Sequence, residues 1–210
     1  MTDGAGGAEE STRDATVDPD DPRRVADCER CPALVESRSR IVNGVGAPEA
    51  DLLFVGEGPG AEEDARGEPF VGRSGDVLDE ALAAAGLARE DVRITNCVRC
   101  RPPDNRDPRV GELANCASHL EREVAAVEPA LVVGLGKVPC EHLLDRDVAV
   151  TAEAGAVETA SLGGAPRDVM VCVHPAATLY DPSQREPLAD AVAAAAERAG
   201  GPGQASLGEF

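Results

Sequence analysis

The sequence has no tryptophan, one tyrosine and three phenylalanines, and Lys137 is its single lysine. With aromatic residues at 2% of the 210 positions, valine, leucine and alanine must fill the core. No apolar run is long enough to span a membrane. The first residues also lack basic side chains and an apolar stretch, which argues against a secretory signal and predicts a cytoplasmic protein. The length suits one α/β domain with tails.

Positive charge is also scarce, because 39 acidic residues stand against 20 basic ones and give a formal net charge of -19. Such a balance ordinarily repels nucleic acid. The acidic excess is spread along the whole chain, however, and arginine supplies nearly all the positive charge, a pattern that resembles proteins adapted to a salt-rich cytosol. At molar salt the Debye length falls to about 3 Å, so local contacts decide binding. Composition therefore does not exclude DNA as a partner.

Both ends of the chain lack an apolar period and are predicted to be disordered tails, over residues 1–24 and 200–210. Residues 25–199 are predicted to form the folded domain. Apolar runs bounded by turn residues predict buried parallel strands at 51–55, 92–95, 130–133 and 169–173. Helical patterns alternate with these strands, at 77–85, 112–127, 138–144 and 187–199. This alternation predicts a doubly wound α/β sheet, in which ligands bind beyond the carboxyl ends of the strands.

The seven cysteines predict metal or cluster ligands, or small apolar fillers, since disulfides are rare in a reducing compartment. Cys28 and Cys31 form a CxxC pair, which fits zinc, an iron-sulfur cluster, a redox dithiol or a chance pair. Together with Cys100 and Cys116 they can complete an all-cysteine shell for either zinc or an iron-sulfur cluster. The remaining three lie in or beside apolar runs and are interpreted as buried small hydrophobes: Cys97, Cys140 and Cys172.

The glycine-rich loop at 56–60 follows the first predicted strand and matches the loose dinucleotide fingerprint at Gly56, Gly58 and Ala61. The match is weak, because three carboxylates at 62–64 would face the phosphate and Pro69 to Gly72 interrupts before the helix. No lysine follows in the pattern of a P-loop. The carboxylates indicate acid-base catalysis or electrostatic stabilisation at the end of the strand, and Glu57 is the residue best placed for this role.

Several stretches together resemble the family 4 uracil-DNA glycosylases, in matching order and spacing over about residues 25–198. They are Gly56–Gly60 with Glu63 and Asp64, Pro69–Gly75, Thr95–Pro103 with Asn105 and Arg106, and His174–Ala177. The resemblance implies a three-layer α/β/α fold around a four-stranded parallel sheet. It also implies a structural [4Fe-4S] cluster held by Cys28, Cys31, Cys100 and Cys116.

The same resemblance implies roles for the substrate pocket. Phe70 is similar to the aromatic residue on which an extruded base stacks, an interaction worth about 1 to 3 kcal/mol. Asn96 is similar to the base reader, whose amide donates to uracil O4 and accepts from N3–H. Glu63 would shape the pocket against the methyl group of thymine, and Gly56 and Gly58 complete the substrate-binding set.

For catalysis, the resemblance implies that His174 donates to uracil O2, where negative charge accumulates as the glycosidic bond breaks. Glu57 would position a water for attack on C1′ and offset the positive charge of the oxocarbenium-like sugar, as in glycoside hydrolysis. His119 and His142 lie on predicted helices and are interpreted as structural.

Duplex DNA must release its base into such a pocket, at a cost of a few kcal/mol. The resemblance implies that the segment after His174 enters the minor groove, with Leu179 as the expected wedge. The sequence departs from the family at Thr178 and Tyr180, where leucines and an arginine are usual. A basic stripe over 93–109 favours contact with the DNA backbone, through Arg99, Arg101 and Arg106.

The sequence thus predicts a glycosylase that removes uracil from DNA and leaves an abasic site. Two alternatives stay open: the same fold acting on another deaminated base, and a non-enzymatic iron-sulfur protein that binds nucleic acid. A zinc module is a third reading of the cysteines. We expect uracil-containing DNA as the partner, a monomer and no membrane, and a sliding clamp or another repair protein is a further candidate partner.

Overall fold

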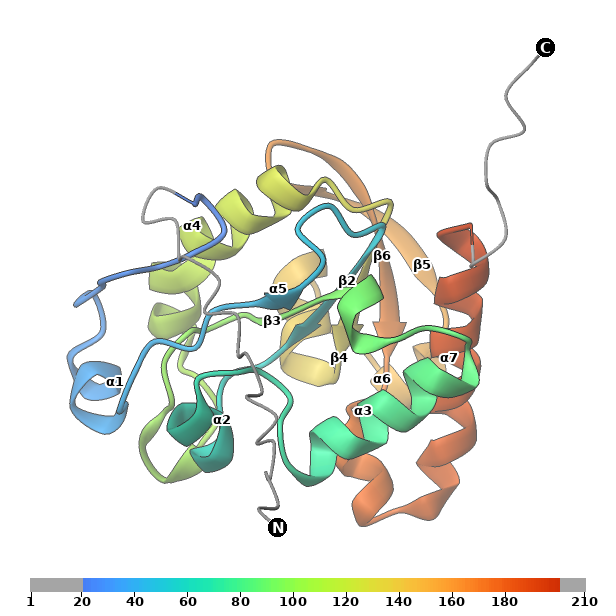
Figure 1. Cartoon of the computed structure of the whole chain (residues 1–210), viewed down its shortest axis with the longest axis horizontal. Coiled ribbons are helices and arrows are strands. Elements are labelled where there is room, and N and C mark those ends of the chain that lie inside the picture. Colours follow the sequence, from blue (N-terminus) through green and yellow to red (C-terminus); the bar gives the residue numbers. More distant parts are fainter. Residues whose placement is uncertain (1–20, 201–210) are drawn as a thin grey trace, which may run out of the picture.

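The central sheet has six strands in the order β1-β3-β2-β4-β6-β5. A computed structural model describes residues 21–200 (Figure 1). The four inner strands are parallel, as predicted: β2 (Leu52–Gly56), β3 (Arg93–Asn96), β4 (Leu131–Leu135) and β6 (Ala165–Cys172). Every residue of β2, β3 and β4 is buried, as expected of parallel strands covered on both faces.

Two antiparallel edge strands extend this sheet beyond the four that were predicted. They are β1 (Val45–Gly46), which pairs with β3, and β5 (Val157–Leu162), which pairs with β6. Neither has the continuous apolar run of an inner strand. β1 has two residues, and most of β5 is exposed or half-buried. An edge strand needs little apolar sequence because it is covered on fewer sides.

Alternating side chains of β2 build two separate cores. Leu52 and Phe54 pack on one face with Leu78 of α3 (Arg73–Ala84) and Val192 of α7 (Arg185–Arg198). On the opposite face Leu53 and Val55 pack with residues of α4 (Val110–Val127) and α5 (Lys137–Leu144). This period of two gives three layers, with α3 and α7 side by side on one face of the sheet (Figure 1).

Short helices complete the fold: α1 (Pro32–Ser37), α2 (Ala61–Arg66) and α6 (Val150–Glu153), with the 3-10 turns η1 (Arg89–Asp91), η2 (Pro103–Asn105), η3 (Pro175–Leu179) and η4 (Pro182–Gln184). The expectation that no helix begins before Gly72 is wrong, because α2 begins at Ala61. The Glu63 carboxylate caps this helix by accepting from the Gly60 N–H at 2.5 Å.

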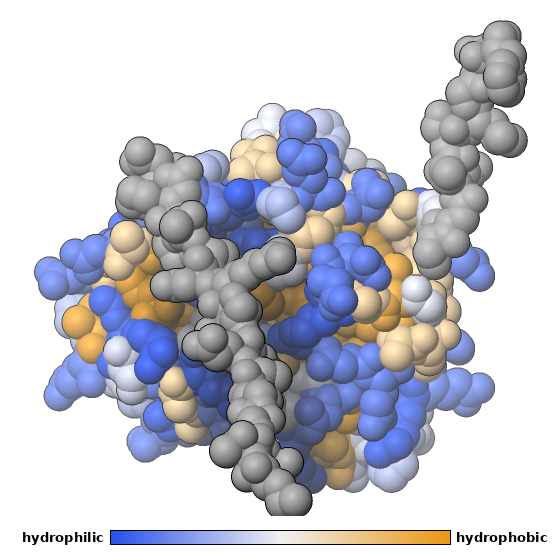
Figure 2. Space-filling model, viewed as in Figure 1, coloured by the Kyte–Doolittle hydropathy of each residue, from blue (hydrophilic) through white to orange (hydrophobic). Residues whose placement is uncertain are grey.

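The predicted tails lie mostly outside the described residues, which leave out 1–20 and 201–210. Residues 21–24, which the sequence assigns to the first tail, are placed against the domain. Arg23 bonds to Asp21 at 2.8 Å and donates to the Pro48 carbonyl at 3.1 Å. Within residues 21–200 no helix is long and apolar enough to cross a membrane. Hydrophilic residues cover much of the face in Figure 2, with apolar side chains showing between them.

Candidate active site

A cavity of about 680 Å³ opens at the carboxyl ends of β2, β3 and β6. Loops that are distant in sequence bring together six of the residues singled out for substrate binding or catalysis. These residues of the cavity lining are Glu57, Gly58, Glu63, Phe70, Asn96 and His174. Gly56 lies directly behind it, since a Cβ at this position would stand 2.3 Å from Asn96 Oδ1. Parallel strands explain the convergence, because their carboxyl ends meet at one edge of the sheet.

The Phe70 ring lies buried beside the imidazole of His174, with ring centroids 5.7 Å apart and planes tilted by 31°. Its backbone has φ of +51°, a left-handed conformation that is unusual outside glycine. Glu63 holds this conformation by accepting from the Phe70 N–H. Close packing of Gly75 adds to the constraint, because a Cβ there would meet the Phe70 carbonyl oxygen at 1.9 Å. The ring is therefore fixed before any base arrives.

Both carboxylate oxygens of Glu63 are occupied by backbone N–H groups, those of Gly60 and Phe70. Burial raises the pKa of Glu63, although these two donors act in the opposite direction. Among the neighbouring acids, Asp64 is also buried and accepts from the Ser39 N–H at 2.9 Å. Glu62 is exposed. Glu63 and Asp64 thus brace the loop by accepting from backbone N–H groups.

Asn96 ends β3 and is 2% exposed, in register with Gly56 of β2. Its Nδ2 atom is buried and finds no hydrogen-bond partner within the described part of the chain. An unpaired buried donor costs about 1 to 3 kcal/mol. The amide is therefore poised for a ligand carbonyl, and the missing side chain of Gly56 provides the room in which the amide sits.

The imidazole of His174 is fixed in one tautomer. Its Nδ1 atom accepts from the Ala176 N–H at 3.1 Å, which assigns the ring proton to Nε2. Burial lowers the pKa of His174 to about 4, so the ring is neutral at pH 7. His174 thus presents a neutral donor at the wall of the cavity. Its Cβ lies close to Gly136.

Glu57 follows β2 directly and is half-buried at the cavity. The Val98 N–H donates to its carbonyl at 3.1 Å and ties the loop to the end of β3. Burial raises the pKa of Glu57 to about 7, and the nearby carboxyl group of Asp107 adds to this effect. The lining also includes polar residues that were given no role from sequence, namely Ser74, Asn105, Asp107 and Tyr180. Asn105 belongs to a motif noted above, which was the one available signal for it.

A second pocket gathers the four cysteines proposed as ligands, Cys28, Cys31, Cys100 and Cys116. Arg38 donates to Cys100 Sγ at 2.9 Å, and Asn115 donates to Cys31 Sγ at 3.4 Å. Burial raises the pKa of Cys116 to about 11. The other three cysteines lie apart in the apolar clusters of the core, as the sequence predicted: Cys97, Cys140 and Cys172.

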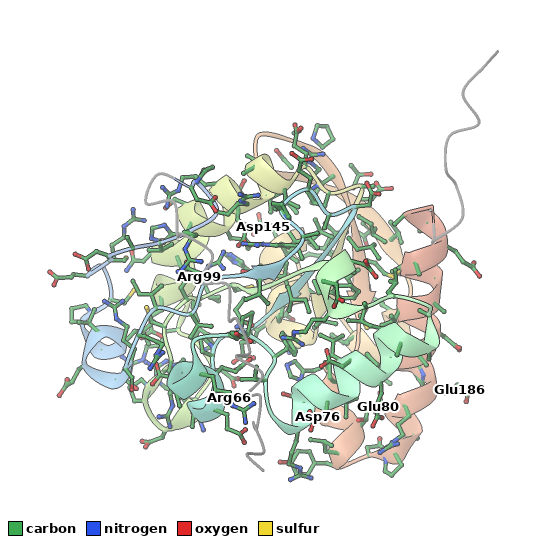
Figure 3. The ribbon with its side chains drawn as sticks, in the orientation of Figure 1. Arg66, Asp76, Glu80, Arg99, Asp145 and Glu186 are labelled. Atoms are coloured by element: carbon green, nitrogen blue, oxygen red, sulfur yellow. The ribbon has the colours of Figure 1, made fainter. Side chains whose placement is uncertain are left out.

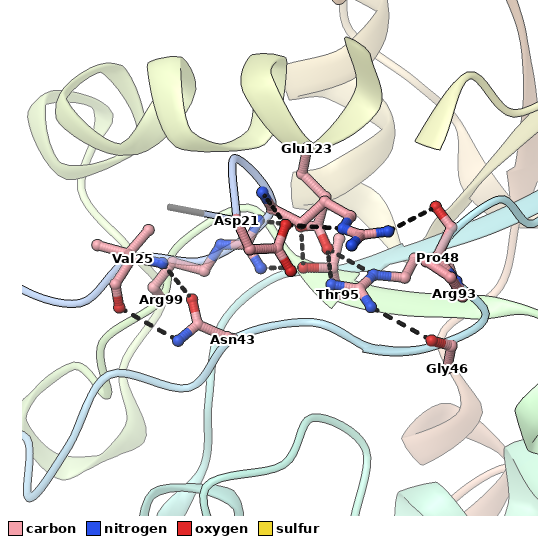
Figure 4. A network of polar contacts seen from close by, with 10 residues as sticks. Asp21, Val25, Asn43, Gly46, Pro48, Arg93, Thr95, Arg99 and Glu123 are labelled. Carbon is pink, nitrogen blue, oxygen red and sulfur yellow. Dashed lines mark hydrogen bonds and ion pairs between the residues drawn. The ribbon is translucent and has the colours of Figure 1, made fainter. Parts of the chain in front are cut away.

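The expectation that Arg99 contacts DNA is wrong. Its side chain is 2% exposed and donates to Thr95 and Glu123, and Figure 3 places it inside the molecule beside α4. Arg93 donates to the other carboxylate oxygen of Glu123 at 2.7 Å (Figure 4). Burial disfavours ionisation of Glu123, but the two guanidinium charges hold its pKa below the usual range. These arginines join β3 to α4, so the predicted basic stripe is partly an internal network.

The other residues predicted to contact DNA lie nearer the surface. Arg106 lines the cavity and donates to both carboxylate oxygens of Glu112, at 2.7 and 2.8 Å. Arg101 donates to the Asn105 side chain at 2.7 Å. Leu179 is half-buried in η3, whereas the next residue, Tyr180, is 86% exposed at the rim of the cavity.

Comparison with known proteins shows which family the sequence matches. The model of the Uracil DNA glycosylase superfamily matches residues 43–196. A type-4 uracil-DNA glycosylase of Archaeoglobus fulgidus is 41% identical over 168 residues, which cover 78% of this chain and 84% of the relative. The type-4 protein of Thermotoga maritima is 43% identical over 63% of this chain and 69% of its own length. A type-5 uracil-DNA glycosylase of Thermus thermophilus is 35% identical over 56% of this chain and 67% of its own length.

Proposed function

Since the chain belongs to the uracil DNA glycosylase superfamily, we propose that it is a DNA repair enzyme that removes uracil from DNA and leaves an abasic site. The observation that carries this proposal is the convergence of Phe70, Asn96 and His174 on one cavity beside Glu57. A buried ring, an unpaired amide and a neutral imidazole donor are what recognition of a flipped pyrimidine requires.

Asn96 selects the base. Its Nδ2 group donates to uracil O4 while its Oδ1 atom accepts from N3–H. Cytosine presents the opposite order of donor and acceptor at these positions, so both atoms of the buried amide would be left unpaired. Such mismatches discriminate by about 10⁴ or more. The buried donor without a partner in the described chain supports this role.

Glycosidic cleavage breaks the bond between C1′ and the base nitrogen, and the electron pair leaves with the base. Negative charge then accumulates on uracil O2, toward which the Nε2–H of His174 donates. Because the imidazole is neutral at pH 7, it stabilises this anion without a proton transfer. Glu57 as a carboxylate orients a water toward C1′ and offsets the positive charge of the sugar.

We further propose that the cysteine pocket holds a [4Fe-4S] cluster, with Cys28, Cys31, Cys100 and Cys116 as ligands. Within residues 21–200 no group of three or more potential ligands converges on the position of a single ion. The four thiols that line one pocket can supply the all-cysteine shell that such a cluster takes. The N–H donors of Arg38 and Asn115 suit thiolate sulfurs. When bound, the cluster would cross-link the segment that leads into α1, the loop after β3 and α4.

Tyr180 is the side chain proposed to fill the gap left in the duplex, in place of Leu179. Its exposure at the rim of the cavity supports this assignment. Tyr180→Ala should lower excision from duplex DNA at least tenfold and leave excision from single strands within twofold. Val110→Ala is the matched control, because Val110 is also exposed, at 84%, but does not line the cavity. Equal loss on both substrates would contradict the assignment.

The central test is excision from a labelled strand with a single uracil, followed by alkali, across a salt series from 0.05 to about 3 M. We expect cleavage by the wild-type protein and a loss of at least 100-fold in Glu57→Gln and His174→Gln. A panel of deaminated bases separates uracil from other lesions. Absence of cleavage at every salt concentration, or unchanged rates in both variants, would refute the proposed function.

A further inference from the structure

Arginines, and no acidic residues, surround the four thiols of the cysteine pocket. Besides the cysteines, the lining consists of Leu34, Val35, Asn115 and the three arginines Arg30, Arg38 and Arg99. In a chain with 39 acidic and 20 basic residues, this lining reverses the average composition. Four thiolates around an iron-sulfur core form an anionic group, whose properties depend on the charges and hydrogen bonds that surround it. The lining therefore suits a ligand of negative charge.

Arg38 contacts one of these sulfurs directly. Its Nη1 atom donates to Cys100 Sγ at 2.9 Å, and its backbone N–H bonds to the Leu34 carbonyl at the end of α1. Within the described chain no ion pair joins Arg38 to an acidic residue. The residue is half-buried, so solvent screens its charge less than that of an exposed arginine. The guanidinium charge of Arg38 is therefore available to the sulfur.

The other two guanidinium groups of the lining have different partners. Arg99 pairs with Glu123, although its Nε atom is buried and has no hydrogen-bond partner within residues 21–200. Such a donor is costly to leave unpaired, so this N–H also suits an acceptor in the pocket. Arg30 is exposed and donates to the Asn115 carbonyl at 2.9 Å and to Ser118 Oγ at 2.7 Å. Arg38 is thus the arginine of the lining that donates to a cysteine sulfur.

From these contacts we propose that Arg38 is a positioning residue for the cluster: it donates a charged hydrogen bond to the Cys100 ligand and raises the reduction potential of the bound cluster. One-electron reduction adds a negative charge to the core. A positive charge and an N–H donor at a ligand sulfur stabilise the reduced form more than the oxidised form. The same hydrogen bond holds the Cys100 thiolate in place, so it also slows the loss of iron.

The inference rests on the proposed [4Fe-4S] cluster, so the experiment begins with iron and sulfide analysis of the full chain, purified without oxygen. The cluster is then titrated with dithionite as the reductant and followed by its visible absorbance. In Arg38→Ala we expect the ratio of reduced to oxidised cluster at a fixed potential to fall about tenfold, which lowers the midpoint potential by about 59 mV for one electron. Arg38→Lys keeps the charge and should restore at least half of this shift.

Arg40→Ala is the matched control. It removes the same charge two residues away, at an exposed position outside the lining of the cysteine pocket. We expect it to keep the wild-type potential, because solvent screens an exposed charge. A second measurement follows the release of iron to a chelator. Arg38→Ala should release iron about fivefold faster than the wild type or more, and Arg40→Ala at the wild-type rate.

An unchanged potential in Arg38→Ala, or an equal shift in Arg40→Ala, would overturn the proposal. If dithionite does not reduce the wild-type cluster, the rate of iron release decides by the same comparison. If Arg38→Ala is isolated without a cluster, the proposal stands only when Arg38→Lys and Arg40→Ala retain theirs. Absence of iron and sulfide from the wild type would overturn the cluster and this inference together, whereas uracil excision, measured separately, decides the proposed enzymatic function.

Discussion

Gly56→Ala places one methyl group between Asn96 and Phe70, the residues proposed to recognise the base. A Cβ at this position would stand 2.3 Å from Asn96 Oδ1 and 2.5 Å from Phe70 Cε2. Ordinary contacts begin near 3.4 Å, so the amide and the ring must each retreat by about 1 Å. Both side chains are buried, and the Phe70 backbone is held by Glu63, so the movement must occur toward the cavity.

The expected loss of activity follows from the size of this displacement, about 1 Å. Misplacing a reacting or recognition group by 1 Å can reduce a rate about 100-fold. We expect kcat/KM for uracil excision to fall by about that factor, measured in single-turnover assays on single-stranded DNA. Overpacking should also lower the free energy of unfolding by about 1 to 3 kcal/mol, measured by urea denaturation. The assay is therefore run at a temperature where the variant remains folded.

Gly111→Ala is the control for this experiment. Gly111 lies in the first turn of α4, and a Cβ there would meet nothing within 4 Å. We expect unchanged excision and a stability equal to the wild type or higher by up to about 1 kcal/mol, because alanine favours helix over glycine. If Gly56→Ala excised uracil at the wild-type rate while folded, the close packing described for Asn96 and Phe70 would not govern recognition.

Three further predictions concern stability and the cofactor. Glu123→Gln should lower the free energy of unfolding by about 3 to 5 kcal/mol, measured by urea denaturation, because two buried arginines lose their counter-charge. Glu158→Gln is the control, and since its ion pair is exposed it should lower the free energy of unfolding by less than about 1 kcal/mol. Cys116→Ala should lose iron and sulfide by elemental analysis, and Cys140→Ala should keep both. The third prediction concerns pH. Between pH 6.5 and 4 the unfolded chain protonates His174 more readily than the native state, so acid should destabilise the wild type relative to His174→Gln by at most about 2.5 kcal/mol at pH 4.5. Equal acid sensitivity of the two proteins would contradict a buried neutral imidazole.

The inner strands and the main helices could be predicted because their sequences have one dominant signal. A strand buried on both faces is a continuous apolar run, as Leu52 to Val55 shows. The edge strands have no such signal. Helix α2 was missed because its cap depends on Glu63 turning back to Gly60, a local contact that a pattern of apolar residues does not report.

Much of the site could be placed from sequence for a topological reason. Glu57, Asn96 and His174 lie at or directly after the ends of parallel strands, and the sheet brings those ends together. Asp107 and Tyr180 lie farther along their loops, so their approach to the cavity depends on how those loops pack. The sequence therefore indicated which strand ends form the site but not these two lining residues.

Arg99 shows why spacing along a chain is a poor guide to surface charge. Five arginines over 93–109 suggest a basic stripe, but the chain is buried from Val92 to Cys100, and Arg99 turns inward to Glu123. Arg93 does the same, and Arg106 is paired with Glu112. The free positive charge beside the cavity is thus much smaller than the sequence suggests, and few phosphates can be neutralised there. Because the salt dependence of DNA binding scales with that number, with a slope near -0.9 per phosphate, about two contacts would give a slope of about -2. For a protein this acidic, we therefore expect most of the affinity for DNA to come from the base itself, in the pocket proposed to involve Phe70 and Asn96.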